Sequence, residues 1–317
     1  MKQFISVNDV PDVAALVQEA IELKKQPYAF NHLGKHKTLG LIFMNPSLRT
    51  RLSTQKAATN LGMEVMVMNF DKDGWTLEMN EGAVMNGTTV EHIKDAAAVM
   101  GLYCDIIGIR SFPSLKNRED DYNEVLLHKF IKYCGVPVVS LESATLHPLQ
   151  SFADAITIKE NWQLARKPKV VLSWAPHIKP LPQAVSNSFA QWMGKTNVDF
   201  VITHPEGFEL DEQFTTNATI THNQAEALEG ADFVYVKNWS GYRDYGKTIT
   251  GAENWMLTEK HLQNSRQAKI MHCLPVRRNL ELSDELIDGS NSLVLQQAHN
   301  RLFAAQTVLK QLLTQML

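Results

Sequence analysis

Short runs of apolar and β-branched residues recur along the chain, and between them the apolar residues follow helical spacing. In the first half the runs cover 38–44, 64–70, 105–110 and 137–142, and in the second half 169–175, 199–204, 218–221, 232–238, 269–274 and 292–295. Strand-like runs that alternate with helical stretches are typical of parallel sheets with crossover helices. The pattern predicts an α/β fold with two domains, each with a central parallel sheet flanked by helices.

The helical stretches indicate where the domains divide. A chain of 317 residues is longer than one hydrophobic core usually reaches, so two domains are expected. The stretch 148–162 has helical spacing, and Lys167-Pro168-Lys169 restarts the strand pattern, so we place the domains at 1–150 and 151–299. The last stretch, 300–317, predicts an amphipathic helix that packs on a neighbouring surface.

Composition and charge exclude several classes of protein. Hydrophobic residues make up 44% of the chain, and 31 Lys and Arg stand against 34 Asp and Glu. This balance gives no overall field that would favour nucleic acid or an anionic membrane, so any anion site must be local. Three widely spaced cysteines fit a reducing compartment without structural zinc. Without a signal-peptide core or a membrane-length apolar run, a cytoplasmic protein is expected.

The junction from Ser47 to Arg51 is the first candidate anion site. It follows a predicted strand and precedes the helical stretch 52–61, so free backbone N–H groups of a helix N-terminus meet two hydroxyls and two guanidiniums within five residues. The absence of a glycine-rich loop argues against a nucleotide P-loop or a dinucleotide turn. The plainer alternative is that Ser47 only caps the helix and the arginines face solvent.

Further polar residues follow the predicted strands, where ligands bind in open α/β sheets. They are Arg110, Glu142, His147, Gln150, His177, His204, Lys237 and the segment from His272 to Arg278. Guanidiniums suit phosphate, and an imidazole can donate to a developing oxyanion. Individually, His147 could satisfy a turn, Arg110 could form a surface ion pair, and Cys273 could be a small buried hydrophobe. Their joint occurrence favours a site that binds a phosphate and polarises a carbonyl.

Three motifs together resemble the aspartate/ornithine carbamoyltransferase superfamily. Ser47 to Arg51 resembles its phosphate signature Ser-x-Arg-Thr-Arg, and His147-Pro148-Leu149-Gln150 with Asp154 resembles His-Pro-x-Gln-x-x-x-Asp. His272-Cys273-Leu274-Pro275 resembles the His-Cys-Leu-Pro of the ornithine-type branch. The resemblance implies that the first domain, completed by the 300–317 helix, binds carbamoyl phosphate and that the second binds the amine. It also implies a homotrimer with shared active sites.

The resemblance further implies the roles of single residues. Carbamoyl phosphate would be held by Ser47, Leu48, Arg49, Thr50, Trp75, Arg110, His147, Gln150, Cys273, Leu274 and Arg301, with Trp75 supplied by the adjacent subunit. Of these, Thr50, Arg110, His147, Gln150 and Cys273 would act on the carbamoyl group. The amine substrate would meet Glu142, His177, Lys237, Arg277 and Val90. No metal or organic cofactor is needed, and the family implies a setting in arginine biosynthesis.

Departures from the family pattern indicate which amine is used. Enzymes acting on free ornithine carry Asp-x-x-x-Ser-Met-Gly, whereas this chain has Lys237 to Tyr242 in that region. A lysine can pair with a carboxylate but cannot accept from an ammonium, so an N-acylated substrate is expected. The segment 174–183 resembles the proline-rich loop of the N-acylornithine enzymes, which implies a knotted chain, a rare feature.

Position 90 is expected to choose between acyl groups. The acetyl-type enzyme is expected to carry a glutamate where this chain has Val90, and a carboxylate there would repel that of a succinyl group. Glu91 is the alternative register, and 279–281 lacks a lysine expected in the acetyl type. N-succinylornithine is therefore the expected substrate, with N-acetylornithine as the alternative. The aspartate enzyme is disfavoured by His-Cys-Leu-Pro, and a catalytically silent carbamoyl-phosphate-binding homologue is a further alternative.

Overall fold

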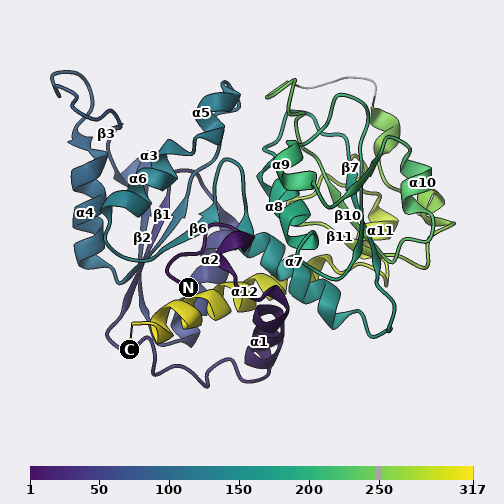
Figure 1. The fold of residues 1–317 in the computed structure, drawn as a ribbon, viewed down its shortest axis with the longest axis horizontal. Helices are drawn as coiled ribbons and strands as arrows, with labels where there is room; N and C mark the ends of the chain where they lie inside the picture. The colour runs from purple at the N-terminus through teal and green to yellow at the C-terminus, as the bar shows by residue number, and fades with distance from the viewer. Residues whose placement is uncertain (248–251, 317) are drawn as a thin grey trace. The chain divides into compact units, whose positions relative to one another are not determined.

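The computed structural model describes residues 1–247 and 252–316 (Figure 1). Within it the chain forms two compact units. The first comprises Met1–Leu149 and Arg301–Leu317, and the second comprises Gln150–Asn300. The division therefore falls within two helices, α7 (Pro148–Glu160) and α12 (Val294–Thr314).

The first unit has a four-stranded parallel sheet in the order β2-β1-β5-β6. Its strands are β1 (Thr38–Phe43), β2 (Glu64–Asn69), β5 (Ile106–Arg110) and β6 (Val138–Glu142), and a small parallel pair joins β3 (Leu77–Glu78) to β4 (Glu91–His92). Its helices are η1 (Val7–Asp9), α1 (Val13–Lys25), α2 (Leu48–Asn60), α3 (Phe70–Asp73), α4 (Ile93–Tyr103), α5 (Arg118–Tyr122) and α6 (Val125–Tyr133). The order confirms the α/β fold with a parallel sheet.

Helices cover both faces of this sheet. Figure 1 shows α4 and α6 on one side and α2 with α12 on the other. On the first side, Phe130 of α6 is buried in a common core with Ile107 and Ile109 of β5. On the other side, Gln306 of α12 accepts from the Asn60 side chain of α2 at 3.0 Å, and Lys310 pairs with Glu19 of α1 at 2.7 Å. The end of α12 is thereby fixed to α1 and α2.

The second unit has a five-stranded parallel sheet in the order β11-β10-β7-β8-β9. The strands are β7 (Lys169–Trp174), β8 (Asp199–Thr203), β9 (Thr219–Thr221), β10 (Phe233–Lys237) and β11 (Lys269–Met271). The helices are α8 (Ala184–Met193), α9 (Glu212–Thr215), α10 (Gln224–Leu228), η2 (Glu253–Trp255), η3 (Glu259–Leu262) and α11 (Asp284–Asp288). A core that includes Val171, Val234 and Ile270 is buried between sheet and helices.

The structure corrects the sequence prediction at two places. The run 292–295 is not a strand, because α12 already begins at Val294 and Ser292 makes only an isolated bridge with Ile270. A four-residue apolar run does not distinguish a strand from the start of a buried helix. The run 269–274 is a strand only as far as Met271, and the polar residues after it belong to a loop.

The proline-rich segment 174–183 contacts the segment after β10. Trp174 donates from its indole to the Trp239 carbonyl at 2.9 Å, and Gln183 donates from its side chain to the Ser240 carbonyl at 2.8 Å. The Ser240 N–H donates to the Leu181 carbonyl at 3.0 Å. The loop is therefore anchored at both ends, and its threading into a knot stays a prediction.

Among the described residues, no helix combines the length and the apolar character that crossing a membrane requires.

Candidate active site

The N-terminus of α2 lies at the carboxyl end of β1, as the sequence predicted. Ser47 is the N-cap residue, with extended backbone (φ −151°), but its side chain makes no capping hydrogen bond in the described structure. Leu48 is exposed, whereas Thr50 in the first turn is buried. The Arg49 Nε atom is buried and makes no hydrogen bond within the described residues. Simple capping by the Ser47 hydroxyl is therefore wrong, and the first turn retains polar groups for a ligand.

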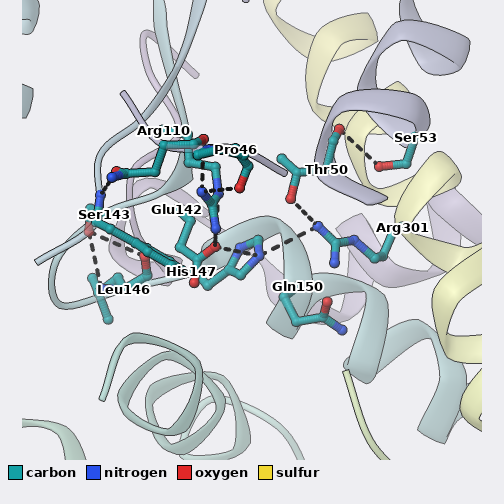
Figure 2. Close-up of polar contacts among 12 residues, drawn as sticks. Pro46, Thr50, Ser53, Arg110, Glu142, Ser143, Leu146, His147, Gln150 and Arg301 are labelled. Carbon is teal, nitrogen blue, oxygen red and sulfur yellow. Dashed lines mark hydrogen bonds and ion pairs between the residues drawn. The ribbon is translucent and has the colours of Figure 1, made fainter. Parts of the chain in front are cut away.

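Arg110 holds the loop that leads into α2 (Figure 2). Its Nη1 donates to the carbonyl oxygens of Asn45 and Pro46, at 3.0 and 2.9 Å. Its Nε and Nη2 lie 3.2 and 3.0 Å from Oε2 of Glu142. The β-bulge between Ile109 and Arg110 brings Arg110 opposite Glu142 in the ladder. Arg110 is thus a buried paired cation and not the surface ion pair considered as the alternative.

Arg301 of α12 reaches the same site. Its Nη2 donates to Oγ1 of Thr50 at 2.6 Å and lies 3.5 Å from Nε2 of His147. All three residues are buried, with at most 5% of their surface exposed. A residue from the far end of the sequence therefore meets the first turn of α2 and the start of α7 within the first unit.

His147 is a neutral imidazole in this setting. Complete burial lowers its pKa well below 6.5, and the positive charges of Arg301 and Arg110 lower it further. Nε2 lies 3.6 Å from Oε2 of Glu142 and faces the Arg301 guanidinium. Nδ1 is buried and has no hydrogen-bond partner within the described residues. An imidazole that faces a guanidinium through Nε2 carries its proton on Nδ1, which leaves Nδ1–H as an unused donor.

Trp75 lies two residues before β3, and Val90 directly precedes β4. Trp75 is 53% exposed and Val90 is 63% exposed. The Trp75 indole donates to Oε2 of Glu91 at 2.9 Å, and the Val90 N–H donates to the Thr76 carbonyl at 2.9 Å. An apolar cavity of about 510 Å³ lies beside Trp75, lined by Phe70, Leu77, Met79 and Leu126 among others. The phosphate contact expected of Trp75 across a subunit boundary stays a prediction.

In the second unit, three of the expected substrate contacts lie at the carboxyl ends of strands: Lys237 is the last residue of β10, and His177 and Arg277 follow β7 and β11. Arg277 donates from Nε to Nε2 of His177 at 3.0 Å. Burial, with the nearby charges of Lys237 and Arg277, lowers the pKa of His177, opposed in part by the Lys179 carbonyl and by Glu281. Lys237 is buried and donates to the Asn238 carbonyl at 2.9 Å. A cavity of about 240 Å³ opens beside His177, between Trp174, Phe208 and Trp239.

A second polar chain in this unit fixes the His-Cys-Leu-Pro segment. Gln150 donates to Oδ1 of Asp154 at 2.8 Å, and Gln297 donates to the same oxygen at 2.7 Å. Gln297 in turn accepts from the His272 N–H at 2.9 Å. Cys273 is 8% exposed, and Leu274 has a left-handed backbone with φ 58°. Oε1 of Gln150 is buried without a hydrogen bond among the described residues, so it can accept from a ligand.

The structure thus brings five expected residues into one cluster of the first unit: Thr50, Arg110, Glu142, His147 and Arg301. Trp75 and Val90 lie on another segment of that unit. Four residues with a part in these contacts were not predicted from the sequence: Asn45 and Pro46, which contribute carbonyls, and Gln297 and Glu281, which fix the loop after β11. Backbone carbonyls leave no sequence signal, and the bond from the His272 N–H to Gln297 joins residues 25 positions apart, which local pattern does not show.

Within residues 1–247 and 252–316, no group of three or more His, Cys, Asp or Glu side chains is placed to hold a metal ion.

Two family models match the chain. The carbamoyl-phosphate-binding domain of aspartate/ornithine carbamoyltransferases matches residues 2–160, and the Asp/Orn-binding domain matches residues 182–312. The chain belongs to the aspartate/ornithine carbamoyltransferase family and is a carbamoyltransferase.

Relatives in two acyl classes cover nearly the whole chain. An N-succinylornithine carbamoyltransferase of Bacteroides fragilis (strain 638R) is 51% identical over 99% of each chain. An N-acetylornithine carbamoyltransferase of Xanthomonas axonopodis pv. citri (strain 306) is 33% identical over 99% of this chain and 97% of the relative. A solved N-acetyl-L-ornithine transcarbamylase, with a glutamate replaced by valine and bound to carbamyl phosphate and N-succinyl-L-norvaline, superposes with a TM-score of 0.93. It is 32% identical, over 98% of this chain and 100% of that one.

Proposed function

We propose that the protein transfers the carbamoyl group of carbamoyl phosphate to the δ-amine of N-succinyl-L-ornithine, giving N-succinyl-L-citrulline and phosphate. The observation that carries the proposal is the buried cluster beside the first turn of α2, in which a neutral His147 lies next to Arg301 and to the Glu142 carboxylate that pairs with Arg110. Such a cluster can hold a phosphate and donate to a carbonyl oxygen without a metal. The 51% identity to the Bacteroides fragilis enzyme supports the amine.

The phosphate would lie at the N-terminus of α2. Ser47, the Leu48 and Arg49 N–H groups, and Thr50 provide donors there, and the helix dipole favours an anion. Arg110 and Arg301 would add charge-assisted bonds that make phosphate a better leaving group. Trp75 would complete the site from the adjacent chain of a homotrimer, since its indole is exposed on the chain that carries it.

The carbamoyl carbon would be activated by donors to its oxygen. Nδ1–H of His147 is buried and unused, and Thr50 and Arg110 lie in the same cluster. Each well-placed donor to a developing oxyanion is worth on the order of 3 kcal/mol. Gln150 and the backbone of Cys273 and Leu274 would bind the carbamoyl amide. The amine then forms the new C–N bond while the C–O bond to phosphate breaks, and its surplus proton leaves with phosphate or solvent.

The second unit would bind the carboxylates of the acylated amine. Lys237, His177 and Arg277 are cationic or hydrogen-bonding groups, and His177 and Arg277 are in direct contact. The three groups are electrostatically coupled, because the positive charges of Lys237 and Arg277 both lower the pKa of His177. We propose that Glu142 orients the δ-amine, although in the structure its carboxylate lies on Arg110. The Glu142 carboxylate would then accept hydrogen bonds from both Arg110 and the δ-amine.

The register at position 90 has physical support. Val90 and Glu91 are consecutive residues of an extended segment, so their side chains point to opposite faces. Glu91 faces Trp75, to which it is hydrogen-bonded. Val90 therefore occupies the other face, without a charge. The solved relative in which valine replaces a glutamate was bound to a succinylated ligand, which fits valine as the residue that admits a succinyl group.

The first test is formation of the ureido product from carbamoyl phosphate with four amines: N-succinylornithine, N-acetylornithine, ornithine and aspartate. We expect turnover with N-succinylornithine. In Val90→Glu, kcat/KM for N-succinylornithine should fall at least about tenfold, since the new carboxylate repels the succinyl carboxylate. Thr89→Glu, one residue away, is the matched control. Preference of the wild type for N-acetylornithine would refute the assignment of Val90, and absence of turnover with every amine would leave the silent homologue.

A further inference from the structure

Glu281 is a carboxylate buried at the end of the loop that follows β11. It is 1% exposed, as is His272 at the start of the same loop. The segment between them carries Cys273, Leu274 and Arg277, to which the proposed function gives substrate contacts. A buried carboxylate beside a proposed anion site is unexpected, because its negative charge would repel the substrate. Its position therefore calls for a structural or functional explanation.

The Glu281 carboxylate touches both ends of this loop. Its Oε2 accepts from the Arg277 backbone N–H at 2.7 Å. Its Oε1 lies 3.5 Å from Nε2 of His272, a contact at ion-pair distance that falls short of hydrogen-bond geometry. Nδ1 of His272 accepts from the Leu274 N–H at 2.9 Å, so the ring carries its proton on Nε2, toward Glu281. One carboxylate thus connects Arg277 directly, and Leu274 through a histidine ring.

The histidine is fixed from a second direction. Its backbone N–H donates to the side chain of Gln297, which also holds Asp154. Backbone bonds tighten the far end of the loop, where the Glu281 N–H donates to the Arg277 carbonyl at 2.9 Å. The ring of His272 is therefore held between a fixed backbone and the carboxylate, and it cannot turn without losing one of its two ring contacts.

Glu281 is ionised across the physiological range. Burial alone would raise its pKa, but the adjacent His272 ring, the charge of Lys237 and the Arg277 N–H together lower the pKa to about 2. The group is thus a permanent negative charge, and Lys237, the cation that helps to stabilise it, belongs to the proposed substrate site.

We propose that Glu281 is a positioning residue for both substrates: through His272 it fixes the Cys273–Leu274 backbone that would bind the carbamoyl amide, and directly it sets the backbone that carries Arg277. The inference rests on the proposed function. It gives a reason for the buried charge, because a neutral group of the same shape would not hold His272 and Arg277 together. Glu281 itself touches neither substrate.

The test compares Glu281→Gln with Glu285→Gln, an exposed glutamate four residues on in α11 that serves as the matched control. We expect Glu281→Gln to lower kcat roughly tenfold or more and to raise KM for N-succinylornithine severalfold. Binding of inorganic phosphate, measured by calorimetry, should stay unchanged because the phosphate groups lie in the first unit. Glu285→Gln should match the wild type. In a double-mutant cycle with His272→Gln, the second change should add little, because both act through one contact chain.

A merely structural role would lower the unfolding midpoint of Glu281→Gln but leave kcat and KM of the folded enzyme unchanged, and that outcome would overturn the proposal. Should Glu281→Gln fail to fold, Glu281→Asp retains the charge but is one methylene too short to reach both partners. Its kcat should still fall, and a wild-type kcat would refute the inference. Inactivity of the wild type with all amines refutes the proposed function instead, so the two failures are distinguishable.

Discussion

The neutral imidazole of His147 lies between two buried guanidiniums, and this placement determines its chemistry (Figure 2). A protonated ring would add a third positive charge to the cluster, which burial makes unfavourable. Neutral, the ring keeps Nδ1–H as a donor, while the positive charge near it comes from the Arg301 and Arg110 guanidiniums. Carbonyl polarisation and phosphate binding are thereby divided between the ring and the arginines.

We expect His147→Ala to lower kcat at least about tenfold, because the carbamoyl oxygen would lose a donor. His128→Ala, an exposed histidine of α6, is the control. Since the pKa of His147 lies well below 6.5, its neutral form persists as the pH falls through 6.5. Titration of His147 should therefore cause no decrease in wild-type kcat near pH 6.5, and the pH profiles of wild type and His147→Ala should have the same shape in that range. An unchanged kcat in His147→Ala would remove the residue from the oxyanion role.

At the scale of elements, the sequence predicted where the sheets lie and failed where side chains replace ladder bonds. Strands β1, β7 and β10 end within one residue of their predicted ends, because alternating and continuous apolar runs report burial. The run 269–274 was wrong after Met271, where Gln297 and Glu281 fix the chain by side-chain bonds. The bond from the His272 N–H to Gln297 joins residues 25 positions apart, so local pattern cannot reveal it.

The candidate site was predictable only in the parts that lie in local sequence motifs. Thr50 and His147 lie in short motifs next to strand ends, which made them visible. Arg301 was expected only through the family resemblance, since nothing near it in the sequence indicates that α12 lies against α2. Its contact with Thr50 spans 251 positions.

Because of Glu281, the free energy of unfolding should decrease at acidic pH. The pKa of Glu281 falls from 4.5 to about 2 on folding, which corresponds to about 3 kcal/mol of stabilisation. This contribution is complete above about pH 4.5 and is lost as the pH falls toward 2, while His272, Lys237 and the Arg277 N–H are the groups that face the carboxylate. Thermal unfolding midpoints of wild type and Glu281→Gln should differ at neutral pH and converge near pH 2. A constant difference would contradict this account.

At the scale of the whole molecule, the proposed sites require more than one chain. Trp75 is exposed on its own chain, and its indole N–H already donates to Glu91. We propose that it serves the cluster around His147 of a neighbouring chain. Homotrimers with such boundary sites can be complemented by mixing, because each subunit contributes a different half of each site.

We expect Trp75→Ala and His147→Ala each to be nearly inactive and to regain activity when the two are dissociated, mixed and reassembled. In random hybrids about a quarter of the sites carry both intact residues. Mixing Trp75→Ala with the Trp75→Ala/His147→Ala double variant supplies no intact Trp75 and should restore nothing. Lack of recovery in the first mixture, with hybrids shown to form, would place Trp75 in the site of its own chain.

The exposure of Val90 bears on how this enzyme could change over generations. The side chain is outside the packed core, so its replacement perturbs folding little, whereas most core replacements are destabilising. Valine codons that end in A or G are one base from glutamate codons. On the proposed role of Val90, a lineage could therefore lose its acceptance of succinylated substrates by a single point mutation, with little effect on folding.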